Sequence, residues 1–164
     1  MVSRYARAPK GERAHGKAPR NWGNNDVTLI SWITLAGMGP SMSIEGPSDR
    51  ESFGLYLNEV LRAKLSPKRI VVMDNLSVHK NRRVRELVEE RWCCELWFLP
   101  AYSPELNPIE QAFSKIKGAL RKAKARGLET LFEATREALR SVTEEDACGF
   151  FSHCGYFEPQ VHSL

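Results

Sequence analysis

Two carboxylates in the second half of the sequence stand where metal-dependent chemistry would need them. Asp74 ends the apolar run RIVVM, and Glu110 follows Asn107 and Pro108 at the start of an expected helix, with 35 residues between the two acids. Side chains at the carboxyl end of a buried strand reach the ligand crevice of an open α/β sheet. If the next strand lies beside the first, both acids reach the same sheet edge, where carboxylate oxygens suit Mg²⁺.

Each acid also has a purely structural interpretation. Asp74 fits an Asx turn or a helix cap that leads into Asn75, and Glu110 fits a capping box with the backbone of Asn107. Taken singly, each of these interpretations is the more common one. The occurrence of both acids at one predicted sheet edge is what favours a shared metal site.

The elements expected around the acids alternate between strands and helices. In chain order they are a hairpin of residues 27–37 and 41–46, a helix capped by Ser48 that ends near Ser66, a strand 69–74 buried on both faces, a helix 79–91 and a strand 93–99. The order helix, strand, helix, strand predicts parallel pairing of the later strands.

Three helices are expected to close the chain. The first begins at the cap Asn107 and runs to about Gly127, the second covers residues 128–141, and Thr143 caps a short third helix before His153. The whole pattern predicts one α/β domain. A chain of 164 residues and 18.6 kDa has the size of one such domain.

Positive charge is concentrated in two places, although the net charge is only +4. Residues 1–26 form an expected basic arm with no apolar period, and residues 115–126 hold six basic residues and no acid. Clustered charge suits a polyanion such as DNA, and it equally suits a solubilising surface. The candidate phosphate-binding residues are Lys117, Arg121 and Lys124 on one helix face and Arg13, Lys17 and Arg20 in the arm.

Three blocks of the sequence resemble the DDE endonuclease domain of the IS630 family of bacterial transposases, within the IS630/Tc1/mariner group. They are VVMDNLSVHK (71–80), FLPAYSPELNPIEQAFSKIK (98–117) and FFSHCGY (150–156), and residues 21–38 match the strand-forming region ahead of the first helix. The interval between Asp74 and Glu110 fits the family's spacing of its second and third acids. The resemblance implies an RNase H-like mixed sheet, with an antiparallel hairpin and parallel later strands, flanked by helices.

The resemblance also implies a chemistry for the matching residues. Asp74 and Glu110 become ligands of Mg²⁺ or Mn²⁺ in a two-metal site that cleaves DNA and transfers strands in transposition of an insertion sequence. Asn75 and His79 belong to the matching block and become neighbours of the active site. For His79 two interpretations remain, a phosphate contact or the first residue of the next helix.

The family's first acid lies on a first strand that precedes the region matched by this sequence. We therefore expect residues 27–164 to be an N-terminally truncated RNase H-like domain without that strand, behind the arm of residues 1–26. Such a chain is expected to be inactive alone, its metal pair complete only when an upstream transposase fragment or a full-length transposase supplies the missing Asp. The alternative is an inactive remnant that binds DNA or associates with intact transposase.

The expected partners and location follow from the same resemblance. The DNA partners are transposon ends and target DNA, and no stretch approaches the ~20 apolar residues of a membrane span. We therefore expect no membrane partner and a cytoplasmic protein associated with the bacterial nucleoid.

Overall fold

A computed structural model describes residues 27–125 and 127–156 of the chain. The expected arm of residues 1–26, with Arg13, Lys17 and Arg20, lies outside the described residues. The strands are β1 (Val27–Ile30), β2 (Ile33–Thr34), β3 (Gly37–Met38), β4 (Met42–Glu45), β5 (Ile70–Met73) and β6 (Glu95–Phe98). The main helices are α1 (Arg50–Leu55), α2 (Arg82–Arg85), α3 (Pro108–Ala123), α4 (Leu128–Arg140) and α5 (Glu144–His153).

The expected hairpin is present, but its turn lies earlier than predicted. β1 pairs antiparallel with β4, and β2 pairs antiparallel with β3, so the turn falls at residues 35–36 rather than at 37–40. Gly37 takes a φ of 101°, a backbone conformation that favours glycine, at the first residue of β3. A hydrogen bond of 2.7 Å between the hydroxyls of Ser31 and Ser41 links the arms where the ladder is interrupted.

The later strands confirm the predicted parallel pairing, with Val71 opposite Leu96 and Met73 opposite Phe98. The prediction that the first of these strands is buried on both faces is wrong. Ile70 is 51% exposed and Val72 41% exposed, while Met73 on the opposite face is buried. Helices cover one face of β5 and β6, and within the described residues the other face is not covered.

Two helices continue beyond their first turns in altered geometry. α1 runs on as the π-helix η1 (Tyr56–Leu61) and the 3₁₀ turn η2 (Arg62–Lys64), and α2 runs on as the π-helix η3 (Glu86–Arg91). Asp49, not Ser48, caps α1, because its carboxylate accepts the backbone N–H of Ser52. α2 begins three residues later than predicted, because Asn81 accepts the N–H of Val84 and is the cap.

The closing helices follow their predicted caps closely. Asn107 is the N-cap residue of α3, after the short 3₁₀ turn η4 (Pro104–Leu106), although its side chain makes no capping hydrogen bond. α3 ends at Ala123, before the predicted boundary, because Lys124 takes the left-handed conformation with φ 47°. The prediction that Thr143 caps the last helix is confirmed, and Asp146 completes its capping box.

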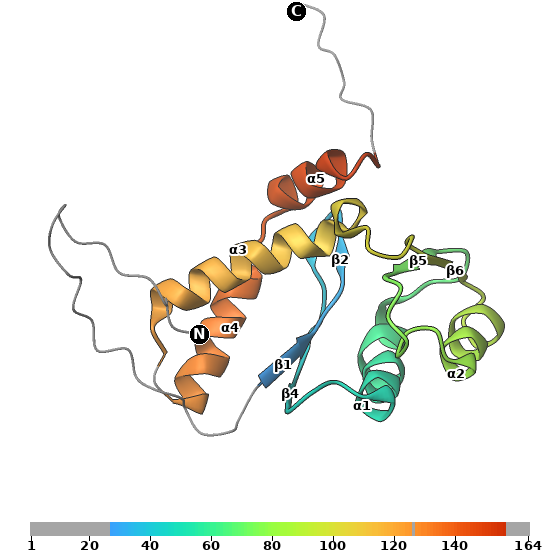
Figure 1. Cartoon of the computed structure of the whole chain (residues 1–164), viewed down its shortest axis with the longest axis horizontal. Helices are drawn as coiled ribbons and strands as arrows, with labels where there is room; N and C mark the ends of the chain where they lie inside the picture. The colour runs from blue at the N-terminus through green and yellow to red at the C-terminus, as the bar shows by residue number, and fades with distance from the viewer. Residues whose placement is uncertain (1–26, 126, 157–164) are drawn as a thin grey trace, which may run out of the picture.

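Two separate apolar clusters hold these elements together, and the hairpin joins them. One cluster packs α1, η1 and η3 against β5 and β6, and Ile30 and Trp32 of the hairpin pack on it. The other packs α3 against α4 around Ile116 and Ala138, and Ile33 and Met38 pack on that one. Figure 1 accordingly shows the hairpin between α3, α4 and α5 on one side and α1, β5 and β6 on the other.

Candidate active site

Asp74 directly follows β5, and its carboxylate is held by two contacts. Oδ1 accepts the backbone N–H of Leu76 at 3.1 Å and lies 2.6 Å from Nδ1 of His79. The first contact is the Asx turn that the sequence allowed. Within the described residues both contacts fall on Oδ1, so Oδ2 is the oxygen left for a further ligand, and the side chain is 35% exposed.

His79 lies in the turn after β5 and does not begin the next helix. Its ring packs on Phe53 of α1, with the ring centroids 4.4 Å apart, and it is 18% exposed. The ring is thus fixed between an apolar side chain and the Asp74 carboxylate. Because Nδ1 contacts the Asp74 carboxylate, the other ring nitrogen, Nε2, points away from that carboxylate.

Asn75 has a buried acceptor without a donor. Its Oδ1 is inaccessible to solvent and has no hydrogen-bond partner among the residues that the structure describes. Asn75 is adjacent to Asp74 in sequence, but it does not line the cavity that the acids share. The structure therefore places it beside the candidate site rather than in its wall.

Glu110 is the third residue of α3, and the capping box that was the alternative interpretation of this acid does not form. The Glu110 N–H donates to the Asn107 carbonyl at 3.1 Å, but no side-chain cap exists at this helix end. Within the described part of the chain, no donor contacts the Glu110 carboxylate. Its side chain is exposed and available to a ligand.

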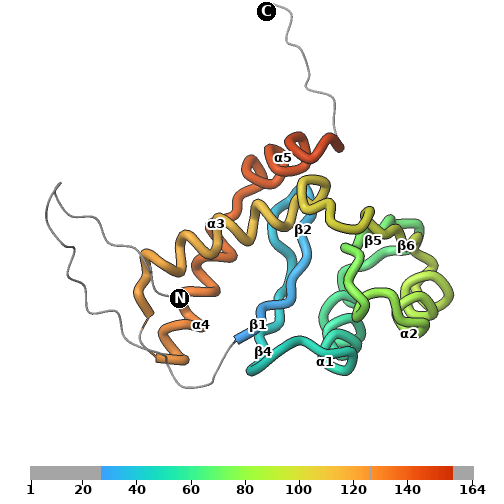
Figure 2. Tube along the Cα trace, in the orientation of Figure 1, coloured from blue at the N-terminus to red at the C-terminus, as the bar shows by residue number. Residues whose placement is uncertain are grey.

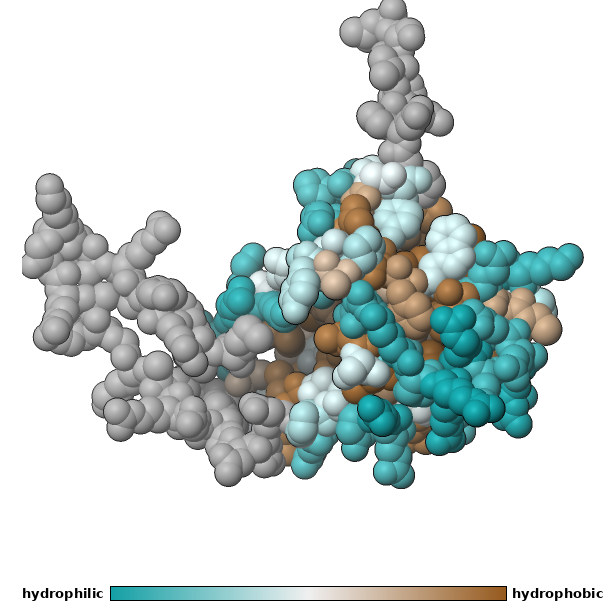
Figure 3. Space-filling view, turned by 45° about the vertical axis from the view of Figure 1, so that its right-hand side comes forward, coloured by the Kyte–Doolittle hydropathy of each residue, from teal (hydrophilic) through white to brown (hydrophobic). Residues whose placement is uncertain are grey.

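One cavity of about 970 Å³ brings the two acids together. Asp74 and His79 line it from the end of β5, and Asn107 and Glu110 line it from the start of α3. Residues more than thirty positions apart thus line one cavity. Figure 2 shows the path of the chain from β5 through β6 to α3. The space-filling view shows apolar side chains gathered in the middle of the molecule beside a strongly hydrophilic flank (Figure 3).

The donor set that the described residues give this cavity fits a hard divalent cation, and those residues alone are too few for a metal pair. Carboxylate oxygens are the ligands that Mg²⁺ takes, and Asp74 and Glu110 supply them. No cluster of three or more His, Cys, Asp or Glu side chains suited to a metal occurs in residues 27–125 and 127–156. Asp49, which precedes both acids in the chain, is engaged in the α1 cap, and this bonding lowers the pKa of its carboxyl.

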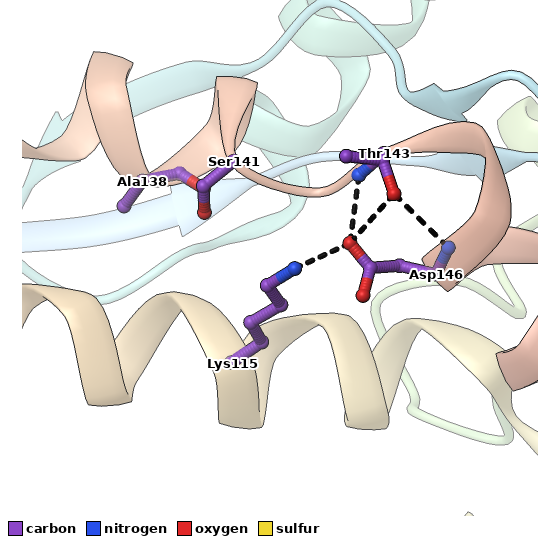
Figure 4. Close-up of polar contacts among 5 residues, drawn as sticks. All are labelled: Lys115, Ala138, Ser141, Thr143 and Asp146. Atoms are coloured by element: carbon purple, nitrogen blue, oxygen red, sulfur yellow. Dashed lines mark hydrogen bonds and ion pairs between the residues drawn. The ribbon is translucent and has the colours of Figure 1, made fainter.

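The basic run on α3 is less uniform than its sequence. Lys115 forms an ion pair with Asp146 of α5, so one cation of the basic run is already paired with an acid (Figure 4). Lys117 and Arg121 are exposed on the helix, whereas Lys124 lies beyond the helix end in the left-handed conformation. The expected face of three cations on one helix is therefore wrong for Lys124, although that side chain is also exposed.

Some contacts in and near the site have no signal in the sequence. The Phe53 ring that supports His79 comes from a helix more than twenty residues earlier, and Asp146 reaches Lys115 across 31 positions. Both contacts depend on how elements pack, and neither follows a short motif. The acidic residues at the start of the last helix predicted a helix cap. They gave no indication that Asp146 pairs with Lys115 on α3.

Comparison with known proteins identifies the family to which this chain belongs. A family model described as DDE superfamily endonuclease matches residues 1–132. The chain belongs to this family of endonucleases. Among curated proteins, none matches the chain.

Solved structures of Mos1 transposase share the fold. The paired-end complex with the left transposon end has a TM-score of 0.77 and 20% identity, over 94% of this chain and 48% of that chain. The Mos1 mariner paired-end complex with Mn has a TM-score of 0.73 and 21% identity, over 96% of this chain and 53% of that chain. The catalytic domain of Mos1 mariner transposase has a TM-score of 0.65 and 21% identity, over 80% of this chain and 76% of that chain.

These likenesses establish that the chain has the RNase H-like fold of the Mos1 catalytic domain. The predicted fold class is thus confirmed. The chain spans about half the length of the chains in the two Mos1 complexes. None of the described helices has both the length and the apolar character that a membrane span requires.

Proposed function

We propose that this chain is the part of an IS630-type bacterial transposase that carries the second and third acids of a metal-dependent DNA cleavage and strand-transfer site. Asp74 and Glu110 are the proposed metal ligands. The observation that carries the proposal is that both acids line one cavity, although 35 residues separate them in the sequence. The family membership supports the same chemistry.

The proposed metal is Mg²⁺ or Mn²⁺, and one of the similar Mos1 complexes is described as containing Mn. A bound pair of such ions activates the attacking oxygen and stabilises the leaving oxygen of the phosphodiester. The protein's own part is to hold the carboxylates. His79 contacts Oδ1 of Asp74, which leaves Oδ2 for a metal, and α3 carries Glu110 in its first turn.

DNA is the proposed partner, namely transposon ends and target DNA, and the similar Mos1 complex holds a transposon end. Lys117, Arg121 and Lys124 support this proposal as exposed cations at and beyond the end of α3. Residues 27–164 form the proposed catalytic unit and residues 1–26 a basic arm. Such a protein would act at the bacterial nucleoid.

Nicking of supercoiled plasmid DNA in Mn²⁺ tests the proposal. We expect slow nicking at most by the wild-type chain, because two carboxylates leave a metal pair short of ligands. Asp74→Asn and Glu110→Gln should each reduce it to the level without protein. Glu105→Gln is the matched control, since Glu105 is an exposed acid of η4 that does not line the cavity.

Two results would count against the proposal. Nicking at the wild-type rate by both acid variants, with folding intact by circular dichroism, would remove the two residues from the mechanism. Nicking by the wild-type chain as fast as by Mos1 transposase would show that no further carboxylate is needed.

A further inference from the structure

The chain turns back on itself where α5 ends, within the block FFSHCGY (150–156). Gly155 takes a φ of 81°, and its N–H donates to the Ser152 carbonyl at 3.0 Å. The N–H of Tyr156 donates to the Phe151 carbonyl at 3.1 Å, and the rings of these two residues lie 5.5 Å apart between centroids. The left-handed glycine, the two hydrogen bonds and the ring contact together define a Schellman motif.

Two contacts cross from this helix end to the start of α3. The hydroxyl of Tyr156 donates to the carbonyl of Leu106, the last residue of η4, at 3.1 Å. Nε2 of Gln111 donates to Sγ of the buried Cys154 at 3.6 Å. Leu106 precedes Glu110 in the chain and Gln111 follows it directly, so the two contacts lie on either side of this acid.

The start of α3 depends on such outside contacts more than most helix starts in this chain. Helices α1, α2 and α5 each begin with a side chain that accepts a backbone N–H of the first turn. At α3 the side chain of Asn107 makes no such bond among the described residues. Because a side-chain cap stabilises the first turn of a helix, a start without one is held less firmly by its own residues.

The end of α5 also forms part of the cavity wall. Phe151 and Tyr156 line the cavity beside Asn107 and Glu110, and Tyr156 is 41% exposed. The ring of Tyr156 is thus fixed by Phe151 on one side and by the start of α3 on the other.

α5 is itself anchored to the rest of the fold. It packs on β3 as well as on α3, Ala147 is fully buried, and Phe150 packs on the apolar cluster of α3 and α4. Figure 1 shows α5 alongside α3 and next to the hairpin. Because the hairpin also packs on the cluster of β5 and β6, α5 links the start of α3 to the part of the molecule that carries Asp74.

We propose that Cys154, Gly155 and Tyr156 form a latch that holds the start of α3 in place, and that Tyr156 is a positioning residue for Glu110. The latch requires neither metal nor DNA. Its effect on metal binding rests on the proposed function, since there Glu110 is a metal ligand.

Tyr156→Phe tests the latch in the full chain without metal, because it removes the hydroxyl and keeps the ring on Phe151. The amides of Asn107 and Glu110 donate to the Pro104 and Asn107 carbonyls at the start of α3. Their hydrogen exchange should become at least threefold faster, since this start opens more often. The amide of Ile116, which is buried in the middle of α3, should change little. Unchanged exchange at Asn107 and Glu110, or equal acceleration at Ile116, would overturn the proposal.

A pair of glycine variants tests the role of the helix end. An added Cβ meets open space at both Gly149 and Gly155, but only Gly155 has a positive φ. Gly155→Ala should therefore disturb the Schellman motif and speed exchange at Asn107 and Glu110 at least threefold. Gly149→Ala is the matched control and should leave this exchange unchanged. The same exchange rates in both variants would contradict the latch.

Mn²⁺ binding by calorimetry separates a positioning role from a merely structural one. Tyr156→Phe should weaken Mn²⁺ binding at least threefold, and Tyr102→Phe, which changes a fully exposed ring outside the cavity wall, should not. Asp146→Asn breaks a different tie between α3 and α5, remote from the cavity, and should leave Mn²⁺ affinity unchanged. Equal losses in Tyr156→Phe and Asp146→Asn would overturn the positioning role.

Glu110→Gln keeps this inference distinguishable from the proposed function. If Glu110→Gln weakens Mn²⁺ binding and Tyr156→Phe does not, the positioning role of Tyr156 is wrong and the metal site stands. If Glu110→Gln leaves Mn²⁺ affinity unchanged, the proposed function fails. Faster exchange at Asn107 and Glu110 in Tyr156→Phe would in that case still support the latch.

Discussion

At the scale of single residues, the arrangement around Asp74 is that of a ligand held in place by its neighbours. The hydrogen bond from His79 and the Asx turn fix one carboxylate oxygen, and the Phe53 ring fixes His79 in turn. A partner that orients a metal ligand commonly changes metal affinity by about 10-fold to 100-fold when it is removed. His79 is therefore a positioning residue of the proposed site.

His79→Ala should weaken Mn²⁺ binding by about 10-fold to 100-fold, measured by calorimetry on the full chain. His79→Asn should recover part of the loss, because its amide nitrogen occupies nearly the position of Nδ1 and can donate to Asp74. A residue that served only packing on Phe53 would show the same Mn²⁺ affinity in both variants. That outcome would contradict the positioning role.

A second residue pair, remote from the cavity, ties α3 to α5. The hydrogen bond from Lys115 is the main cause that lowers the pKa of Asp146 from 3.8 to about 2, and Thr143 donates to the same carboxylate (Figure 4). A carboxyl whose pKa is lower in the folded state stabilises the fold above its unfolded pKa. That contribution is lost as the pH falls from about 4 through about 2.

Asp146→Asn should lower the free energy of unfolding at pH 7, and its difference from wild type should shrink between pH 5 and pH 2. Denaturant unfolding at a series of pH values measures this. Glu145→Gln is the control, because Glu145 lies in the same helical turn, is exposed and makes no ion pair within the described residues. A constant difference between wild type and Asp146→Asn down to pH 2 would contradict the assignment.

At the scale of elements, α3 carries both the site and the proposed DNA-binding surface. Glu110 is in its first turn, and Lys117 and Arg121, four positions apart, share one exposed face. Under the proposed function, the cations on that face would neutralise phosphates of the bound DNA. Each phosphate contact contributes about 0.9 to the slope of log K against log salt concentration.

Lys117→Gln combined with Arg121→Gln should weaken DNA binding and reduce the magnitude of that slope by about 1.8. Fluorescence anisotropy with a labelled duplex, from low to moderate salt, measures both quantities. Arg62→Gln combined with Lys64→Gln removes the same charge from the exposed turn η2 and should leave the slope unchanged. Equal effects of the two double variants would show that only net charge matters.

At the scale of the whole molecule, the hairpin lies between α3, α4 and α5 on one side and α1, β5 and β6 on the other (Figure 1), and both apolar clusters pack on it. Residues of β1 and of β5 line the cavity. Local signals in the sequence predicted the parts of this arrangement that local chemistry determines. Asn107 and Thr143 mark helix starts through capping preferences, and the apolar runs before Asp74 and around Leu96 mark parallel strands. The two candidate metal ligands, Asp74 and Glu110, were predicted from their positions at a strand end and a helix start, together with the family resemblance.

The parts that the sequence did not predict depend on contacts between distant elements. Because Gly37 adopts a positive φ, the chain turns at residues 35–36 and Gly37 is the first residue of β3. The sequence pattern instead predicted Gly37 as the last residue of the preceding strand. The run before Asp74 implied burial on two faces, but Ile70 and Val72 are exposed on the face of β5 that the helices do not cover within the described residues. The pairing of Lys115 with Asp146 likewise depends on how α5 packs on α3.

The most direct test of the central claim is to locate bound Mn²⁺ by paramagnetic broadening of the amide signals of the full chain. If Asp74 and Glu110 hold the metal together, substoichiometric Mn²⁺ should broaden signals of residues 74–79 and 107–111 first. Asp74→Asn and Glu110→Gln should each abolish this broadening, and Glu105→Gln should preserve it. Broadening centred on the acidic first turn of α5, or unchanged in both acid variants, would contradict the account.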